Sequence, residues 1–174
     1  MKKFLISIIL TFLVGGSVFA QSQTEISRDA KNGSKVIKGI ISRQDLESDT
    51  AFAWYAENLK YYHPQPTAVA ALKKNPNIEF IVFMGTWCDD SHFIVPKFFS
   101  LLDSSGFSQE KVSMFGVDRN KKTLRHFSEA MNITNVPTII VMNKGKEVGR
   151  VIEYGKTGYW DKELGEIIDS IQLE

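Results

Sequence analysis

The stretch around the only cysteine of this 174-residue chain constrains its fold more than any other part of the sequence. Residues 78–84 are apolar apart from Glu79, as in a strand buried in the middle of a sheet. Cys88 follows this strand after a short connection, and residues 89–102 have the pattern of a helix interrupted by Pro96. A buried strand that leads into a helix predicts an α/β fold with the cysteine at the start of the helix.

Further strand and helix patterns flank this unit on both sides. Strands are predicted over residues 112–117, 138–142 and 147–154, and helices over residues 45–62, 67–74, 123–131 and around Leu164, Ile167, Ile168 and Ile171. From residue 78 onward the order is therefore strand, helix, strand, helix, hairpin and helix. Thr123 is the candidate N-cap of its helix. Four aromatic residues of the segment 45–62 are expected to pack in the core rather than to line a substrate groove: Trp54, Tyr55, Tyr61 and Tyr62.

This order of elements, and several separate positions within it, resemble the thioredoxin-like superfamily. The matching positions are Trp87 before the cysteine, Pro96 eight residues after it, Asp118 at the end of the next strand, Pro137 after Val136, and Gly155 after the last strand. The resemblance is to exported bacterial thioredoxin family proteins, here with a monothiol Trp-Cys-x-x-Ser motif. It implies a thioredoxin-like α/β fold, in which helices flank a central mixed sheet, over residues 78–174. An N-terminal helical extension would precede it over residues 35–77.

By resemblance, the Val136–Pro137 peptide bond should be cis. The Val136 backbone would then lie beside Cys88, where an extended substrate segment could pair with it. Trp87, Val136, Pro137 and Thr138 are therefore expected to form the substrate-binding surface. An ordinary trans proline at the entrance of a strand is the alternative.

Ser91 stands where thioredoxins carry a second cysteine, so one chain cannot close a disulfide within this motif. Val82 and Met114 stand where these proteins usually carry a buried acid and a lysine, which handle the proton of the second cysteine. The three departures agree with one another and favour a site that works with a single thiol. Cys88 is then the expected nucleophile. Ser91 would either donate a hydrogen bond to its sulfur or only solvate the start of the helix.

The residues next to Cys88 have opposing effects on its ionisation. Unpaired backbone N–H groups and the dipole of the helix favour a thiolate, whereas the carboxylates of Asp89 and Asp90 oppose it. His92 comes four residues after Cys88, on the same face of the predicted helix, and could stabilise the thiolate as a cation or act as a base. Solvent exposure without a role is the simpler expectation for His92.

No metal or other cofactor is expected. Cys88 and His92 suit zinc or copper, but a closed site needs four ligands, and His63 and His126 lack ligand spacing. One-cysteine peroxidases place a threonine or serine three residues before the cysteine, where this chain has Gly85. The sequence therefore favours chemistry carried by the sulfur alone.

Residues 1–20 carry the pattern of a secretory signal peptide, with two lysines, an apolar run shorter than a membrane span, and small residues before the cleavage site. Residues 21–34 are polar and are predicted to be a flexible lead-in. The protein is therefore expected to be exported, to a bacterial periplasm or to the medium. The rest of the chain is almost neutral, because the first 20 residues hold two of the 21 basic residues and none of the 20 acidic ones. Neither nucleic acid nor, after signal cleavage, a membrane is an expected partner.

The sequence predicts an exported monothiol thioredoxin-like protein that exchanges thiols and disulfides with protein substrates through Cys88. Its partners would be proteins with a disulfide or an oxidised cysteine. An external thiol or reductase would have to resolve the mixed disulfide, since the chain has no second sulfur for that step. The alternative is a non-enzymatic binding or chaperone-like module that uses the same surface, with Cys88 buried or incidental.

Overall fold

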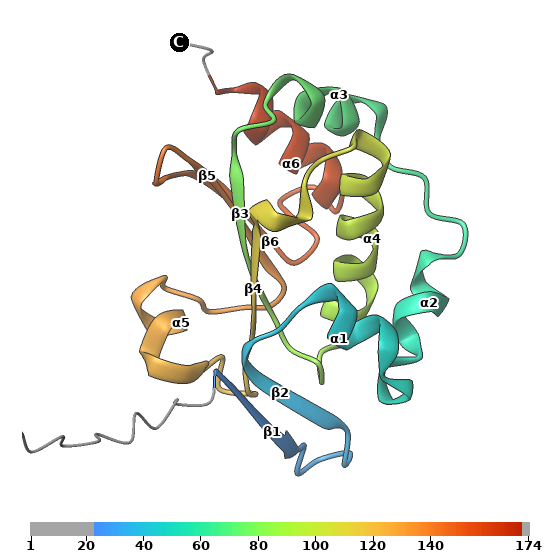
Figure 1. Cartoon of the computed structure of the whole chain (residues 1–174), viewed down its shortest axis with the longest axis vertical. Coiled ribbons are helices and arrows are strands. Elements are labelled where there is room, and N and C mark those ends of the chain that lie inside the picture. Colours follow the sequence, from blue (N-terminus) through green and yellow to red (C-terminus); the bar gives the residue numbers. More distant parts are fainter. Residues whose placement is uncertain (1–22, 172–174) are drawn as a thin grey trace, which may run out of the picture.

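The computed structural model describes residues 23–171, which form one six-stranded mixed sheet (Figure 1). The strands are β1 (Thr24–Arg28), β2 (Lys35–Ile40), β3 (Glu79–Met84), β4 (Val112–Gly116), β5 (Thr138–Asn143) and β6 (Lys146–Ile152). Their order across the sheet is β1-β2-β4-β3-β5-β6, and β3 and β4 are parallel whereas the other neighbours pair antiparallel. The predicted α/β class is confirmed, and the fold is thioredoxin-like.

Helices cover the two faces of the sheet unequally (Figure 1). One face carries α1 (Arg43–Ser48), α2 (Trp54–Leu59), α3 (Pro66–Lys74), α4 (Asp89–Ser105) and α6 (Trp160–Asp169), and the other carries α5 (Phe127–Ala130). The connections contain the short 3-10 helices η1 (Thr50–Phe52), η2 (Gln109–Lys111) and η3 (Leu124–His126). The main core lies on the first face, where Phe80 and Val82 of β3 share a buried cluster with Phe98 and Leu101 of α4. This core fixes the direction in which α4 leaves β3.

The N-terminal segment is ordered where a lead-in was predicted. Residues 24–28 form β1, which pairs antiparallel with β2, and β2 joins β4 through Gly39 opposite Gly116. The lead-in predicted over residues 21–34 is thereby corrected, because most of it belongs to a hairpin. Most side chains of β1 are exposed, and its sequence therefore lacks the alternating apolar pattern of a half-buried strand. Backbone hydrogen bonds to β2 hold β1 in the sheet.

The extension over residues 35–77 is a strand followed by helices rather than a purely helical segment. The single helix predicted over residues 45–62 is divided among α1, η1 and α2. The division occurs at Asp49, which is extended and accepts the N–H of Ala51 at 2.9 Å through its carboxylate. Tyr55 of α2 is buried, as expected of a core residue, whereas Tyr61 lies after the end of α2 and is exposed, so the expectation was wrong for Tyr61. The signal peptide predicted over residues 1–20 lies outside the described residues.

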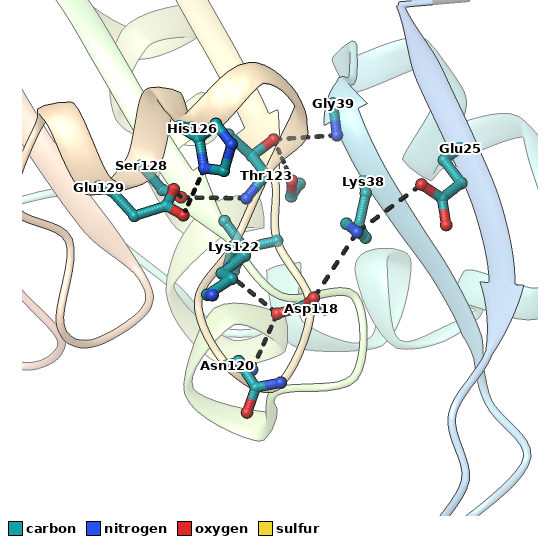
Figure 2. Close-up of polar contacts among 12 residues, drawn as sticks. Glu25, Lys38, Gly39, Asp118, Asn120, Lys122, Thr123, His126, Ser128 and Glu129 are labelled. Atoms are coloured by element: carbon teal, nitrogen blue, oxygen red, sulfur yellow. Dashed lines mark hydrogen bonds and ion pairs between the residues drawn. The ribbon is translucent and has the colours of Figure 1, made fainter.

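The helix predicted to begin at Thr123 is broken as well. Arg125 and His126 have left-handed φ angles of 58° and 57°, so α5 begins only after them. Thr123 does not cap a helix. Its hydroxyl accepts the N–H of Gly39 at 3.1 Å and donates to the carbonyl of Gly116 at 2.8 Å (Figure 2). Thr123 therefore ties β2 to β4 near the edge of the sheet where Cys88 lies.

Candidate functional site

Three segments of the chain meet at one edge of the sheet. β3 leads into Cys88, the parallel strand β4 leads into Asp118 and Arg119, and the antiparallel strand β5 begins just after Pro137. Their neighbouring ends therefore lie at the same edge. Cys88 is the N-cap residue of α4, as predicted, and is partly buried.

The sulfur of Cys88 contacts the segment around the proline. Its Sγ donates a hydrogen bond to the carbonyl of Val136 at 3.2 Å, and the Val136–Pro137 peptide bond is cis. The cysteine and proline motifs, far apart in sequence, thus form one site. Thr138, predicted to contact substrate, is instead buried and donates its hydroxyl to the carbonyl of Asn135 at 2.8 Å. Thr138 therefore holds the loop before Pro137 and does not present a surface.

Ser91 has a structural role that the sequence did not indicate. Its side chain is fully buried, and its hydroxyl accepts the N–H of Gly85 at 3.1 Å. The predicted hydrogen bond from Ser91 to the sulfur of Cys88 is not among the contacts of the described residues. Ser91 thus closes the turn between β3 and α4 that carries Cys88, so its effect on the sulfur is indirect.

His92 is neither exposed nor placed as a cation beside the sulfur. Its ring stacks on Trp54 with centroids 4.1 Å apart, and Nε2 is 2.9 Å from the carbonyl of Thr86, an acceptor to which it must donate. Burial lowers the pKa of His92, although the Thr86 carbonyl and the charge of Asp89 act in the opposite direction. This geometry fits a neutral imidazole that supports the turn between β3 and α4 by its contacts with Thr86 and Trp54. Trp54 was not predicted here, because its contact with His92 joins distant parts of the chain.

The two acidic residues after Cys88 differ in their surroundings. Asp89 is fully exposed, with its carboxylate 3.8 Å from Nδ1 of His92. Asp90 makes a hydrogen bond with Tyr154, and burial, together with this carboxylate, raises the pKa of Tyr154. The ring of Tyr154 also packs on Phe93 of α4, with centroids 5.7 Å apart. Both rings are partly exposed, so an apolar rim borders the start of α4.

Trp87 is held on two sides. Its Nε1 donates to the carbonyl of Val117 at 2.8 Å, and the guanidinium of Arg119 lies over its ring at 4.7 Å from the ring centroid. Gly85 leaves room for this ring, since a Cβ there would lie 2.7 Å from Trp87. Arg119 is bound in turn by Asp29 of the N-terminal hairpin. Neither Arg119 nor Asp29 was predicted as a site residue, because no local pattern links them to the cysteine.

No family model matches the chain. A curated protein named thioredoxin, from Echinococcus granulosus, is 29% identical to it over 91 residues, which are 52% of this chain and 79% of that protein. This similarity in sequence agrees with the thioredoxin-like fold of the chain. A solved structure of an HIV epitope scaffold has a TM-score of 0.38 at 16% identity, covering 75% of this chain and 81% of that one.

The two positions that the resemblance associates with proton transfer are apolar and buried. Val82 of β3 and Met114 of β4 are direct partners in the parallel ladder, and both are buried. A thioredoxin-like relationship supports a redox role. The positions that usually hold its buried acid and lysine here hold two side chains that cannot transfer a proton.

Within residues 23–171, no group of three or more histidine, cysteine, aspartate or glutamate side chains is placed to hold a metal ion. In the same part of the chain, no helix is both long enough and apolar enough to cross a membrane.

Proposed function

We propose that this chain is an exported monothiol thioredoxin-like protein that carries out thiol–disulfide exchange on protein substrates through Cys88. The observation that carries the proposal is the contact of the Cys88 thiol with the Val136 carbonyl, next to a cis proline and at the start of α4. Export is inferred from the signal-peptide pattern of residues 1–20. The expected compartment is a bacterial periplasm or the medium.

The first step is attack by the Cys88 thiolate on one sulfur of a client disulfide. A bond forms between Cys88 and that sulfur, the client's own S–S bond breaks, and its second sulfur leaves as a thiolate that takes up a proton. Ionisation of Cys88 first releases its proton from the Val136 carbonyl, which then becomes free to accept an N–H from an extended client segment. Trp87 and Pro137 would border that segment.

The second step needs a sulfur from outside the chain. Ser91 is buried and cannot attack the mixed disulfide, so an external thiolate must attack one of its two sulfurs. Attack on the Cys88 sulfur releases the client with a reduced cysteine and leaves Cys88 bonded to the external thiol. A second external thiol then restores Cys88. The protein therefore depends on a thiol or reductase in its surroundings.

A binding module is the second candidate, and one observation favours it. In the structure the thiol proton is held by the Val136 carbonyl and Cys88 is partly buried, as an inert thiol would be. Such a module would use the surface around Trp87 and Pro137 to hold a client without forming a bond to it.

Reaction of the purified, reduced protein with a model protein disulfide tests the proposal. We expect a mixed disulfide on non-reducing gels, its disappearance on addition of a small thiol, and no adduct with Cys88→Ser. Alkylation of Cys88 at several pH values, followed by mass spectrometry, measures the reactivity of the sulfur independently. A folded protein that forms no adduct and resists alkylation up to pH 9 would support the binding module instead.

A further inference from the structure

The N-terminal hairpin reaches the site through one buried carboxylate. Asp29, in the turn between β1 and β2, is only 7% exposed. Its carboxylate accepts the backbone N–H groups of Lys31 at 2.8 Å and Asn32 at 3.2 Å, and the guanidinium of Arg119 through Nε and, at 3.1 Å, through Nη2. Arg119 is the main cause that lowers the pKa of Asp29. This two-point contact fixes the plane of the guanidinium.

The guanidinium that Asp29 holds lies next to the cysteine motif. It covers the ring of Trp87, the residue directly before Cys88. The hydrogen bond with Asp29 is the main cause that raises the pKa of Arg119, and the charges of Cys88 and Asp89 raise it further. Arg119 therefore places a positive charge over the side chain of the residue that directly precedes Cys88. Its charge is opposite in sign to that of the nearby Asp89 carboxylate.

A second contact holds the loop that carries Arg119. Asp118 accepts the N–H groups of Asn120 at 2.9 Å and Lys122 at 3.0 Å, which closes the turn after β4 (Figure 2). Lys38 of β2 bridges Asp118 at 3.6 Å and Glu25 of β1 at 3.7 Å (Figure 2). The hairpin therefore holds this loop at two points, of which only Asp29 contacts Arg119.

We propose that Asp29 and Arg119 are positioning residues for Cys88, through which the N-terminal hairpin fixes the Trp87 ring and a positive charge beside the sulfur. The inference rests on the thiol chemistry proposed for Cys88 and assigns to the hairpin a part in it. A fixed cation at this place favours reaction of the sulfur with negatively charged partners over neutral ones of the same size. It therefore selects among small thiols and disulfides by their charge.

Two alkylating reagents that differ in charge test this inference. The reduced protein is treated with neutral iodoacetamide and with anionic iodoacetate, and the ratio of the two rates at Cys88 is measured by mass spectrometry at low ionic strength. We expect Arg119→Gln to lower the iodoacetate-to-iodoacetamide ratio about fivefold, because it removes one charge near the sulfur. High salt should reduce this difference.

Asp29→Asn separates positioning from net charge. This variant makes the protein more positive, so an effect of net charge alone would raise the ratio. If Asp29 holds Arg119 in place, its loss releases the guanidinium from Trp87 and the ratio falls. Glu110→Gln is the matched control, since it removes an exposed carboxylate from η2, before β4, whereas Arg119 follows β4. It should leave the ratio within about twofold of the wild type.

An unchanged ratio in Arg119→Gln, or a rise in Asp29→Asn, overturns the inference. Circular dichroism and urea unfolding verify that each variant is folded, and if Asp29→Asn is not, Arg119→Gln decides alone. The outcome is independent of the exchange activity. If the iodoacetate-to-iodoacetamide ratio falls in Arg119→Gln but the wild type forms no mixed disulfide, the positioning role stands and the proposed function is rejected. If the wild type forms mixed disulfides but the ratio does not change in Arg119→Gln, the proposed function stands and the positioning role is rejected.

Discussion

At Ser91, a hydroxyl occupies the place of a resolving sulfur and also accepts the Gly85 N–H at 3.1 Å. The two properties are linked, because the same buried position that would hold a second thiol is here part of the turn that carries Cys88. A thiol is a weaker acceptor than a hydroxyl. A change at Ser91 therefore alters both the chemistry of the motif and the stability of its turn.

Replacement of this serine by cysteine should add a second reactive sulfur. We expect Ser91→Cys to close an intramolecular disulfide with Cys88 on mild oxidation, and to reduce a model protein disulfide faster than the wild type. The gain should be modest, since Val82 and Met114 still supply no proton-handling group. A turbidity assay of disulfide reduction measures the rates, and mass spectrometry detects the disulfide.

The matched control, Ser91→Ala, removes the acceptor for Gly85 and adds no thiol. It should lower the free energy of unfolding by about 1–3 kcal/mol, the cost of a buried unsatisfied N–H, and form no intramolecular disulfide. A Ser91→Cys variant that equals an ordinary dithiol thioredoxin in rate would contradict the importance given to Val82 and Met114.

His92 should make stability depend on pH. Burial lowers its pKa in the folded state below the usual 6.5, so the unfolded chain binds more protons in the range between the two values. Stability from this residue is therefore present above pH 6.5 and declines as the pH falls below it. His92→Gln should make the free energy of unfolding less dependent on pH between 7.5 and 5, by at most about 1.4 kcal/mol per pH unit.

Urea unfolding at several pH values measures this effect. Equal slopes for the wild type and His92→Gln would show that the stacked imidazole does not titrate as described.

Local patterns in the sequence were sufficient for Cys88 but not for its neighbours. The two motifs are contiguous stretches that are readily recognised, and the resemblance they carry implied that Cys88 and Pro137 meet. The contacts of His92 with Trp54 and of Arg119 with Asp29 were missed, since each joins residues from distant segments and none of these side chains forms a pattern. Ser91 was assigned to the wrong partner because its sequence position does not reveal that its hydroxyl faces Gly85.

Among the elements, β3 and α4 were predictable and the N-terminal hairpin was not. β3 is buried and apolar, and α4 has its proline and its terminal Gly106, whose φ of 71° is the left-handed conformation expected at a helix end. β1 exposes most of its side chains, so backbone hydrogen bonds to β2 hold it in the sheet. Backbone hydrogen bonds require no particular side chains, and the sequence of β1 therefore has no pattern that predicts a strand. The break before α5 was missed because two residues adopt left-handed φ angles without being glycine.

The join between β2 and β4 depends on two facing glycines, Gly39 and Gly116. A Cβ on Gly116 would lie 2.1 Å from the carbonyl oxygen of Ile37, so Gly116→Ala must push the hairpin away from β4. We expect this variant to lose at least about 2 kcal/mol of unfolding free energy. It should also increase hydrogen exchange in β1 and β2 before the rest of the sheet is affected.

Ser113→Ala is the control for this prediction, because Ser113 is an exposed residue of the same strand. It should change the free energy of unfolding by no more than about 0.5 kcal/mol. Normal exchange protection in the hairpin of Gly116→Ala would mean that the two strands tolerate a wider separation than the structure indicates.

For the whole molecule, the lack of a resolving sulfur should lengthen the life of its adducts. We expect cells that make the wild-type protein to contain Cys88-linked mixed disulfides with other exported proteins or with a small thiol, visible on non-reducing gels and by mass spectrometry. Cys88→Ser should abolish them all, and Pro137→Thr should change their identities. Recovery of Cys88 only as the free thiol, with no effect of Cys88→Ser under oxidative stress, would argue against exchange.

The meeting of three strand ends at one edge of the sheet has a kinetic consequence. Cys88, Arg119 and Pro137 come from β3, β4 and β5, and Asp29 lies 90 residues before Arg119, so these contacts join distant parts of the chain. Contacts of this kind close late and slowly in folding. Until then, Cys88 is an ordinary exposed thiol that reacts with whatever oxidant or disulfide it meets. The preference of Cys88 for negatively charged over neutral reagents would therefore appear only at the last stage of folding. Its appearance over time would report when that stage is complete.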